Sequence, residues 1–166
     1  MTIRRLRRDE VDGWRDLRLR MLTESPAAFG TTLETALAAP HEEWVARTEA
    51  LATGSDRAMF VADEAGELVA GAGAVPDPDD AAVPHLVAMW VAPQARGRGV
   101  GRGLVEAVID WARELGAPSI RLFVVDHNAG ALALYERCGF RQTGHLVPLP
   151  RDPSVMEVEM RLDLRT

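Results

Sequence analysis

Apolar residues recur at helical spacing in four segments of the chain, and the segments between them have runs or alternations typical of strands. The segment 99–115 has the most regular helical pattern, and Gly116 with Pro118 ends it. Its single apolar stripe consists of Val100, Leu104, Val105, Val108, Ile109, Ala112 and Leu115. Further helices are predicted over 9–22, over 40–52 and from Asn128 to Gly139, the last with Ala131, Leu134, Tyr135 and Cys138 on one face.

Strand patterns fill most of the remaining chain. The pattern predicts strands over 2–6, 85–93, 119–125, 140–149 and 155–164, and a hairpin over 58–76 around the turn "DEAGE". Residues 85–93 are apolar on both faces, which is typical of a strand in a sheet covered on both sides. We expect a loop with one helical turn after residue 22. The alternation of elements predicts a mixed α/β fold, and the length of 166 residues predicts a single domain over 1–166.

Composition narrows the classes of function. The net charge of −6 argues against wholesale binding to nucleic acid or to an anionic membrane. The chain has no run of about 18 apolar residues, and its basic N-terminus is not followed by the apolar segment of a signal peptide. The single cysteine, Cys138, permits no internal disulfide and fits a reducing compartment. We therefore expect a cytoplasmic protein without membrane or nucleic-acid partners.

Glycines alternate with arginines where the helix 99–115 begins. Gly97, Gly99, Gly101 and Gly103 stand among Arg96, Arg98 and Arg102. A glycine inside a helix costs about 1 kcal/mol relative to alanine, so something must offset it. The first N–H groups of a helix lack internal partners and bind anions, above all phosphate, and glycine lets a ligand approach them closely. A turn that serves chain geometry alone explains Gly97 but not four alternate glycines.

Two common phosphate sites are excluded. A Walker-type loop needs a lysine, and all 19 basic residues are arginine. A dinucleotide-binding loop needs the spacing G-x-G-x-x-G and an acidic residue about 20 positions further on. Here the spacing is G-x-G-x-G-x-G, and the following strand reaches no carboxylate before Asp126.

Two motifs resemble those of the GCN5-related N-acetyltransferases, the GNAT family. "QARGRG", residues 94–99, is similar to the family's phosphate loop Q/R-x-x-G-x-G/A. "NAGALALYERCGF", residues 128–140, is similar to its helix N-x-x-A-x-x-L-Y-x-x-x-G-F. The resemblance is specific over 85–140, and the order of elements fits the family over most of the chain. It implies the GNAT fold, a mixed and mostly antiparallel sheet that is splayed at its centre and has helices on both faces.

The resemblance also implies a reaction and a site. Acetyl-CoA would be the cosubstrate, with no metal, and the acetyl group would pass to a primary amine of a small molecule or peptide by direct attack. The backbone of Gly97 to Arg102 would hold the pyrophosphate, and a backbone N–H near Met89 would polarise the acetyl carbonyl. The implied cofactor-binding residues are Met89, Trp90, Val91, Arg96, Gly97, Arg98, Gly99, Val100, Gly101, Arg102, Asn128 and Tyr135.

Tyr135, the only tyrosine, is the candidate catalytic residue, because its hydroxyl can protonate the departing thiolate. Its spacing alone would also fit a tyrosine of the core. Asn128 would bind the pantetheine arm, and it can cap its helix at the same time. The segments 23–40 and 146–155 usually shape the acceptor pocket in this family.

The proton acceptor for the amine stays open. Val83 and Phe123 stand where some relatives carry a glutamate base, so we expect the proton to leave through water or another polar group. The other candidates are His85, Asp126, His127 and Glu157, with weaker claims for His41 and His145. Two other classes also stay open: a non-catalytic acyl-CoA sensor, and a small-molecule binding protein that uses the groove for another phosphate ligand. The acceptor, the use of other acyl groups and the oligomeric state, a homodimer included, are not predicted.

Overall fold

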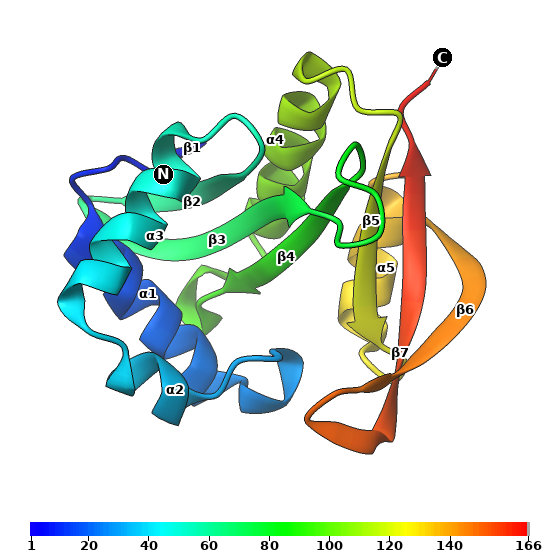
Figure 1. The fold of residues 1–166 in the computed structure, drawn as a ribbon, viewed down its shortest axis with the longest axis horizontal. Coiled ribbons are helices and arrows are strands. Elements are labelled where there is room, and N and C mark those ends of the chain that lie inside the picture. The colour runs from blue at the N-terminus through cyan, green and yellow to red at the C-terminus, as the bar shows by residue number, and fades with distance from the viewer. Residues whose placement is uncertain (166) are drawn as a thin grey trace.

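The computed structural model describes residues 1–165, and its strands form one seven-stranded sheet (Figure 1). The order of strands in the sheet is β1-β2-β3-β4-β5-β7-β6. Every neighbouring pair is antiparallel except β4 and β5, as the predicted fold requires. The strands are β1 (Thr2–Arg5), β2 (Ala58–Glu64), β3 (Glu67–Pro76), β4 (Pro84–Val91), β5 (Ser119–Val125), β6 (Arg141–Leu149) and β7 (Asp152–Asp163).

Helices cover both faces of the sheet, as expected (Figure 1). They are α1 (Val11–Glu24), α2 (Leu33–Ala38), α3 (His41–Thr53), α4 (Val100–Glu114) and α5 (Ala129–Arg137), with short 3-10 turns at Pro26–Ala28 and Pro93–Ala95. Helix α4 packs on strands β1 to β5, whereas α1 packs on β3 and α3 on β2. The pattern missed α2, which begins at Leu33 and is capped by Thr32, whose side chain accepts a hydrogen bond from Thr35 N.

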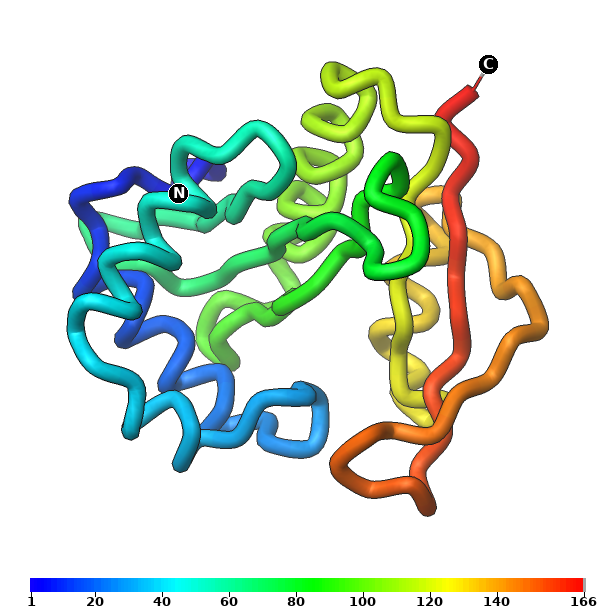
Figure 2. Tube along the Cα trace, in the orientation of Figure 1, coloured from blue at the N-terminus to red at the C-terminus, as the bar shows by residue number. Residues whose placement is uncertain are grey.

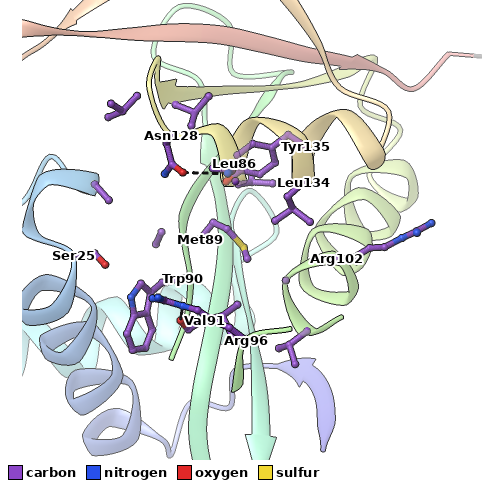
Figure 3. A pocket seen from close by; sticks show the side chains of 18 of the residues that line it. Ser25, Leu86, Met89, Trp90, Val91, Arg96, Arg102, Asn128, Leu134 and Tyr135 are labelled. Carbon is purple, nitrogen blue, oxygen red and sulfur yellow. Dashed lines mark hydrogen bonds between the residues drawn. The ribbon is translucent and has the colours of Figure 1, made fainter. Parts of the chain in front are cut away.

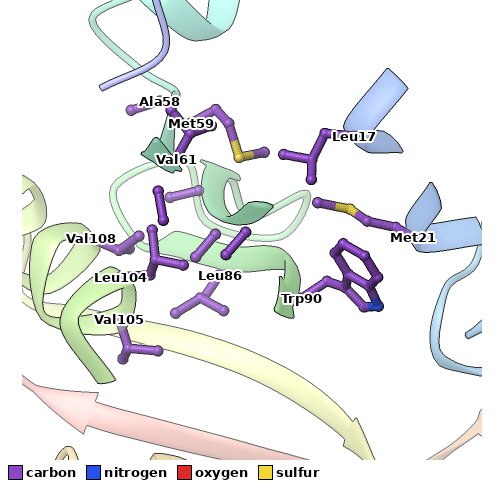
Figure 4. Packing of buried hydrophobic residues seen from close by; sticks show 14 of the residues in the cluster. Leu17, Met21, Ala58, Met59, Val61, Leu86, Trp90, Leu104, Val105 and Val108 are labelled. Carbon is purple, nitrogen blue, oxygen red and sulfur yellow. The ribbon is translucent and has the colours of Figure 1, made fainter. Parts of the chain in front are cut away.

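The apolar stripe of α4 is buried in the core except at its end. Figure 4 shows Leu104, Val105 and Val108 of α4 packed beneath the strands, together with Met59 and Leu86 of the sheet. The prediction was wrong for Leu115, which is 46% exposed. This residue is the C-cap, after the last helical turn, and Trp111 completes the buried stripe instead.

The sheet is splayed between its two parallel strands. Within residues 1–165, β4 and β5 pair in register only at His85 and Arg121, and the strands then diverge (Figure 2). At the closed end of the splay, Arg121 donates to Asp77 at 2.8 Å and to Glu159 at 2.6 Å. Both carboxylates are buried, so this ion-paired cluster ties β5 to β7 and to the end of β3.

A bulge redirects β4 on its way to the open end of the splay. Gly71 pairs with Trp90 and Gly73 with Val87, so Ala88 and Met89 of β4 face a single residue of β3. Ala88 has a φ of 54°, which is unusual for a residue with a side chain. Bulges bend a strand and re-aim its groups. The apolar pattern of 85–93 predicted the strand but gave no sign of the bulge.

Candidate functional site

A groove of about 830 Å³ occupies the gap between β4 and β5, and we call it the β4–β5 groove. The start of α4 forms one end of it, and α5 forms a side wall (Figure 3). The segment 25–29, after α1, closes it from the opposite direction. All the predicted cofactor-binding residues line the groove except Arg98.

The glycine loop presents free backbone donors to this groove. Gly97 and Gly99 have φ values of 76° and 78°, and a Cβ at either position would meet open space. Gly99 is the N-cap of α4, and the helical ladder begins with Gly103 N donating to Gly99 O. The N–H groups of Val100, Gly101 and Arg102 therefore precede the ladder and carry the positive end of the helix dipole. This arrangement suits an anion such as a phosphate.

The other two glycines serve close packing. A Cβ on Gly101 would lie 3.0 Å from Met89 Cε, and one on Gly103 would lie 2.5 Å from Ile3 Cδ1. These contacts bring the start of α4 directly against β4 and β1. The four glycines that the sequence groups together thus divide into a pair that shapes the loop and a pair that seats the helix.

The arginines around the loop are paired with carboxylates. Arg96 lies 3.0 Å from Glu24, and Arg102 lies 2.8 Å from Glu106. Arg98 pairs with Glu64 of β2 at 2.8 Å, which explains why it does not line the groove. In each pair the glutamate offsets the charge of the arginine. The backbone donors therefore contribute more to anion binding than the number of arginines in the sequence suggests.

Glu24 joins the end of α1 to the floor of the groove. It accepts hydrogen bonds from Trp90 Nε1 at 2.8 Å and from Arg96 at 3.0 Å. Hydrogen bonds from Ser25, Trp90 and Arg96 hold the pKa of Glu24 below its usual value. Trp90, one of the implied cofactor-binding residues, thus lines the groove and ties its wall to the end of α1.

Asn128 and Tyr135 face the groove from α5 (Figure 3). The Asn128 side chain accepts from Ala131 N at 3.2 Å, so it caps the helix as predicted. Tyr135 is 6% exposed, and its ring packs edge-on against Phe140 at 5.9 Å. Burial raises the pKa of Tyr135, so the hydroxyl keeps its proton at neutral pH.

Of the candidate proton acceptors, only Glu157 lines the groove. Burial raises the pKa of its carboxyl above the usual value. His85 instead packs edge-on against Phe123 at 5.6 Å, whereas Asp126 and His127 pair with each other at the exposed end of β5. His145 lies beyond Phe123, His41 begins α3, and Val83 is buried before β4.

The two segments expected to shape an acceptor pocket meet at the mouth of the groove. Arg151, between β6 and β7, donates to the carbonyl of Pro26. Phe29, three residues later, lines the groove, as does Phe123 on β5. Sequence reasoning did not single out Phe29, although an aromatic residue between Pro26 and Gly30 in an otherwise small-residue loop is a usable signal.

Within residues 1–165, no three His, Cys, Asp or Glu side chains come together in a way that could hold a metal ion. No helix in this range has the length and apolar character needed to cross a membrane.

Known proteins share both the sequence pattern and the architecture. The model of the Acetyltransferase (GNAT) family matches residues 16–140. The IAA acetyltransferase of Azospirillum brasilense is 33% identical over 107 residues, which cover 64% of this chain and 69% of that protein. The mycothiol acetyltransferase of Beutenbergia cavernae is 43% identical over 61 residues, which cover 37% of this chain but 20% of that protein.

A solved structure extends the likeness to the whole fold. The acetyltransferase-type protein yncA from Salmonella typhimurium, determined with its cofactor acetyl-CoA, has a TM-score of 0.82. It is 21% identical, with coverage of 100% of this chain and 95% of that one. The match to the family model, the splayed sheet and the two motifs agree: the chain belongs to the GNAT family of acetyltransferases, for which acetyl-CoA is the cosubstrate.

Proposed function

We propose that residues 1–166 act as a single N-acetyltransferase domain that transfers the acetyl group of acetyl-CoA to a primary amine of a small molecule or peptide. One observation carries the proposal. The β4–β5 groove brings together the free N–H groups at the start of α4, the bulged edge of β4 and the Tyr135 hydroxyl. These are an anion cradle, a backbone polarising group and a proton donor in one cavity.

The chain's backbone would hold the phosphate end of the cosubstrate. The N–H groups from Gly97 to Arg102 would donate to the pyrophosphate, and the absence of a side chain on Gly97 and Gly99 leaves room for it. The edge of β4 at Met89 and Val91, which β5 does not pair, would hydrogen-bond the pantetheine arm with Asn128. The residues present therefore fit acetyl-CoA.

The chemistry needs three groups of this chain. When bound, acetyl-CoA supplies an activated thioester. A backbone N–H at the bulge near Met89 would polarise its carbonyl, an oxyanion role that needs no side chain. The amine nitrogen forms a bond to the acetyl carbon as the carbon–sulfur bond breaks. Glu157 would accept the proton that the amine loses, and Tyr135 would donate a proton to the sulfur.

The sequence left the proton acceptor open between water and several polar residues, and we assign it to Glu157, one of those candidates. The assignment is supported by the place of Glu157 in the groove and by its burial, which leaves its carboxyl a stronger base than an exposed one. The relatives carry different names, mycothiol acetyltransferase and IAA acetyltransferase, so the acceptor of this chain must be inferred from its own pocket.

A free-thiol assay tests the proposal. Purified protein, acetyl-CoA and a panel of primary amines should release CoA only when an amine is present, with the acetylated amine detected by mass spectrometry. Binding of acetyl-CoA without amine-dependent release would favour the sensor alternative. No binding of acetyl-CoA would overturn the proposal altogether.

A further inference from the structure

A second cavity, of about 420 Å³, lies between α1, α3 and strands β2 to β4, and we call it the α1–α3 cavity. It shares Val87 and Ala88 of β4 with the β4–β5 groove. The two also meet at Phe29. The Arg18 guanidinium, in the wall of the α1–α3 cavity, lies 5.0 Å from the Phe29 ring, which lines the groove. The α1–α3 cavity therefore opens beside the β4 bulge, where the acetyl group would be held.

The wall of this cavity is apolar and cationic. Trp14 and Trp44 are the largest apolar residues in its lining. Three arginines also line it, and within residues 1–165 its lining includes no aspartate or glutamate. Such a wall is unexpected in a chain whose net charge is −6. The cavity is thus a local site of positive charge.

Only one of these three arginines lacks a carboxylate. Arg47 pairs with Glu43, and Arg57 pairs with Asp56. Arg18 is half-buried, and its one side-chain hydrogen-bond acceptor within residues 1–165 is Met21 Sδ, at 3.7 Å. Burial, with the charge of Arg47, lowers the pKa of Arg18. An anion at this position would relieve both effects.

A second donor in the same wall lacks a partner. Within residues 1–165, Trp44 Nε1 is the one buried side-chain nitrogen or oxygen without a hydrogen bond. Because this nitrogen is itself buried, Trp44 contributes its apolar ring to the wall rather than a hydrogen bond. Arg18 and Trp44 come from different helices, α1 and α3, and both face the α1–α3 cavity.

We propose that the α1–α3 cavity holds the acceptor amine and that this acceptor carries a carboxylate, which pairs with Arg18. The proposal rests on the proposed function. A single unpaired cation matches a monoanion, and a guanidinium binds a carboxylate through two parallel N–H groups. The apolar body of the acceptor lies against Trp14 and Trp44, and its amine reaches the groove beside Ala88.

The test compares matched acceptors on matched variants. The probes are apolar and aromatic amino acids and, for each, the corresponding carboxamide, which keeps the amine and the body but has no negative charge. The proteins are the wild type, Arg18→Met and Arg15→Met. Met keeps much of the aliphatic volume of arginine, and Arg15 lies on the same helix but outside the lining of both cavities. The acid-to-amide ratio of kcat/KM cancels the intrinsic reactivity of each amine when variants are compared. Calorimetry with the same probes in the presence of CoA gives a readout that needs no turnover.

We expect the acid-to-amide ratio and the binding of acids to fall at least tenfold in Arg18→Met and to stay within twofold in Arg15→Met. An equal ratio in Arg18→Met and the wild type would overturn the proposal, as would a panel of acids that neither bind nor react. Calorimetry with acetyl-CoA separates failure of this inference from failure of the proposed function. If acetyl-CoA binds and amines are acetylated without preference for acids, this inference alone fails, whereas loss of acetyl-CoA binding in the wild type refutes the proposed function.

Discussion

His85 of β4 and Arg121 of β5 are register partners at the closed end of the splay, and Arg121 holds that end through two buried carboxylates. Its guanidinium donates to Asp77 and to Glu159, whose side chains are 2% and 8% exposed. The chain therefore places an ion-paired cluster where the two halves of the sheet still touch. The groove begins beyond that point, so the cluster lies at the base of the splay.

Replacing Arg121 by Met should destabilise the protein by about 3–5 kcal/mol at neutral pH, because two buried carboxylates lose their cation. Burial alone would raise the pKa values of Asp77 and Glu159, but hydrogen bonds and the charge of Arg121 lower them overall. Carboxyl groups with lowered pKa values stabilise the fold above their ordinary values, near 4, and lose that contribution as the pH falls. Urea unfolding should show the difference between wild type and variant shrinking as the pH falls below about 4. A difference that does not change with pH would contradict this role.

Replacing Tyr135 by Phe should remove the proton donor without disturbing the packing on Phe140. We expect kcat to fall by about 10²–10⁴, the usual contribution of a positioned acid, with unchanged affinity for acetyl-CoA. Because the ring keeps its packing on Phe140, the melting temperature should stay close to that of the wild type. A kcat within twofold of wild type at saturating substrates would exclude Tyr135 from the mechanism.

Replacing Glu157 by Gln should abolish the acid limb of the pH profile. Burial raises the pKa of this carboxyl, and only the ionised form accepts a proton. In the wild type, kcat/KM should therefore rise with pH through a value above that of an ordinary glutamate. The variant should lose this limb and about 10²-fold or more in kcat. Asp126→Asn, at the exposed end of β5, is the control and should keep the limb. If Glu157→Gln keeps both limb and rate, the proton leaves through water.

Local patterns predicted most of the fold. The stripe of α4, the turn at Gly116 and the cap at Asn128 depend on neighbours within a few residues, and the structure confirms them. The exposure of Leu115 and the formation of α2 were not predicted, because both depend on what packs beside these residues. The bulge at Ala88 was missed for the same reason, since it arises from the register with β3.

The parts of the candidate site that depend on local backbone and sequence motifs were predicted. The ion pairs between residues distant in sequence were not. The glycine loop could be recognised because free N–H groups follow from the start of a helix. The partners of Arg96, Arg98 and Arg102 could not, because Glu24 and Glu64 are distant in sequence. Arg18 left one signal that was overlooked: it stands among the buried residues of α1, between Trp14 and Met21, at helical spacing.

Two glycines at opposite ends of α4 test whether the start of this helix binds the pyrophosphate of acetyl-CoA. Gly99 and Gly116 have φ values of 78° and 75°, and a Cβ at either position would meet open space. Gly99→Glu and Gly116→Glu therefore carry similar backbone strain and the same added charge, but only Gly99 lines the groove. Calorimetric titration with acetyl-CoA measures the difference. The wild type and Gly116→Glu should bind with equal affinity, and a folded Gly99→Glu should bind at least 100-fold more weakly. Equal binding by all three proteins, or equal loss of binding in both variants, would contradict pyrophosphate binding at the start of α4.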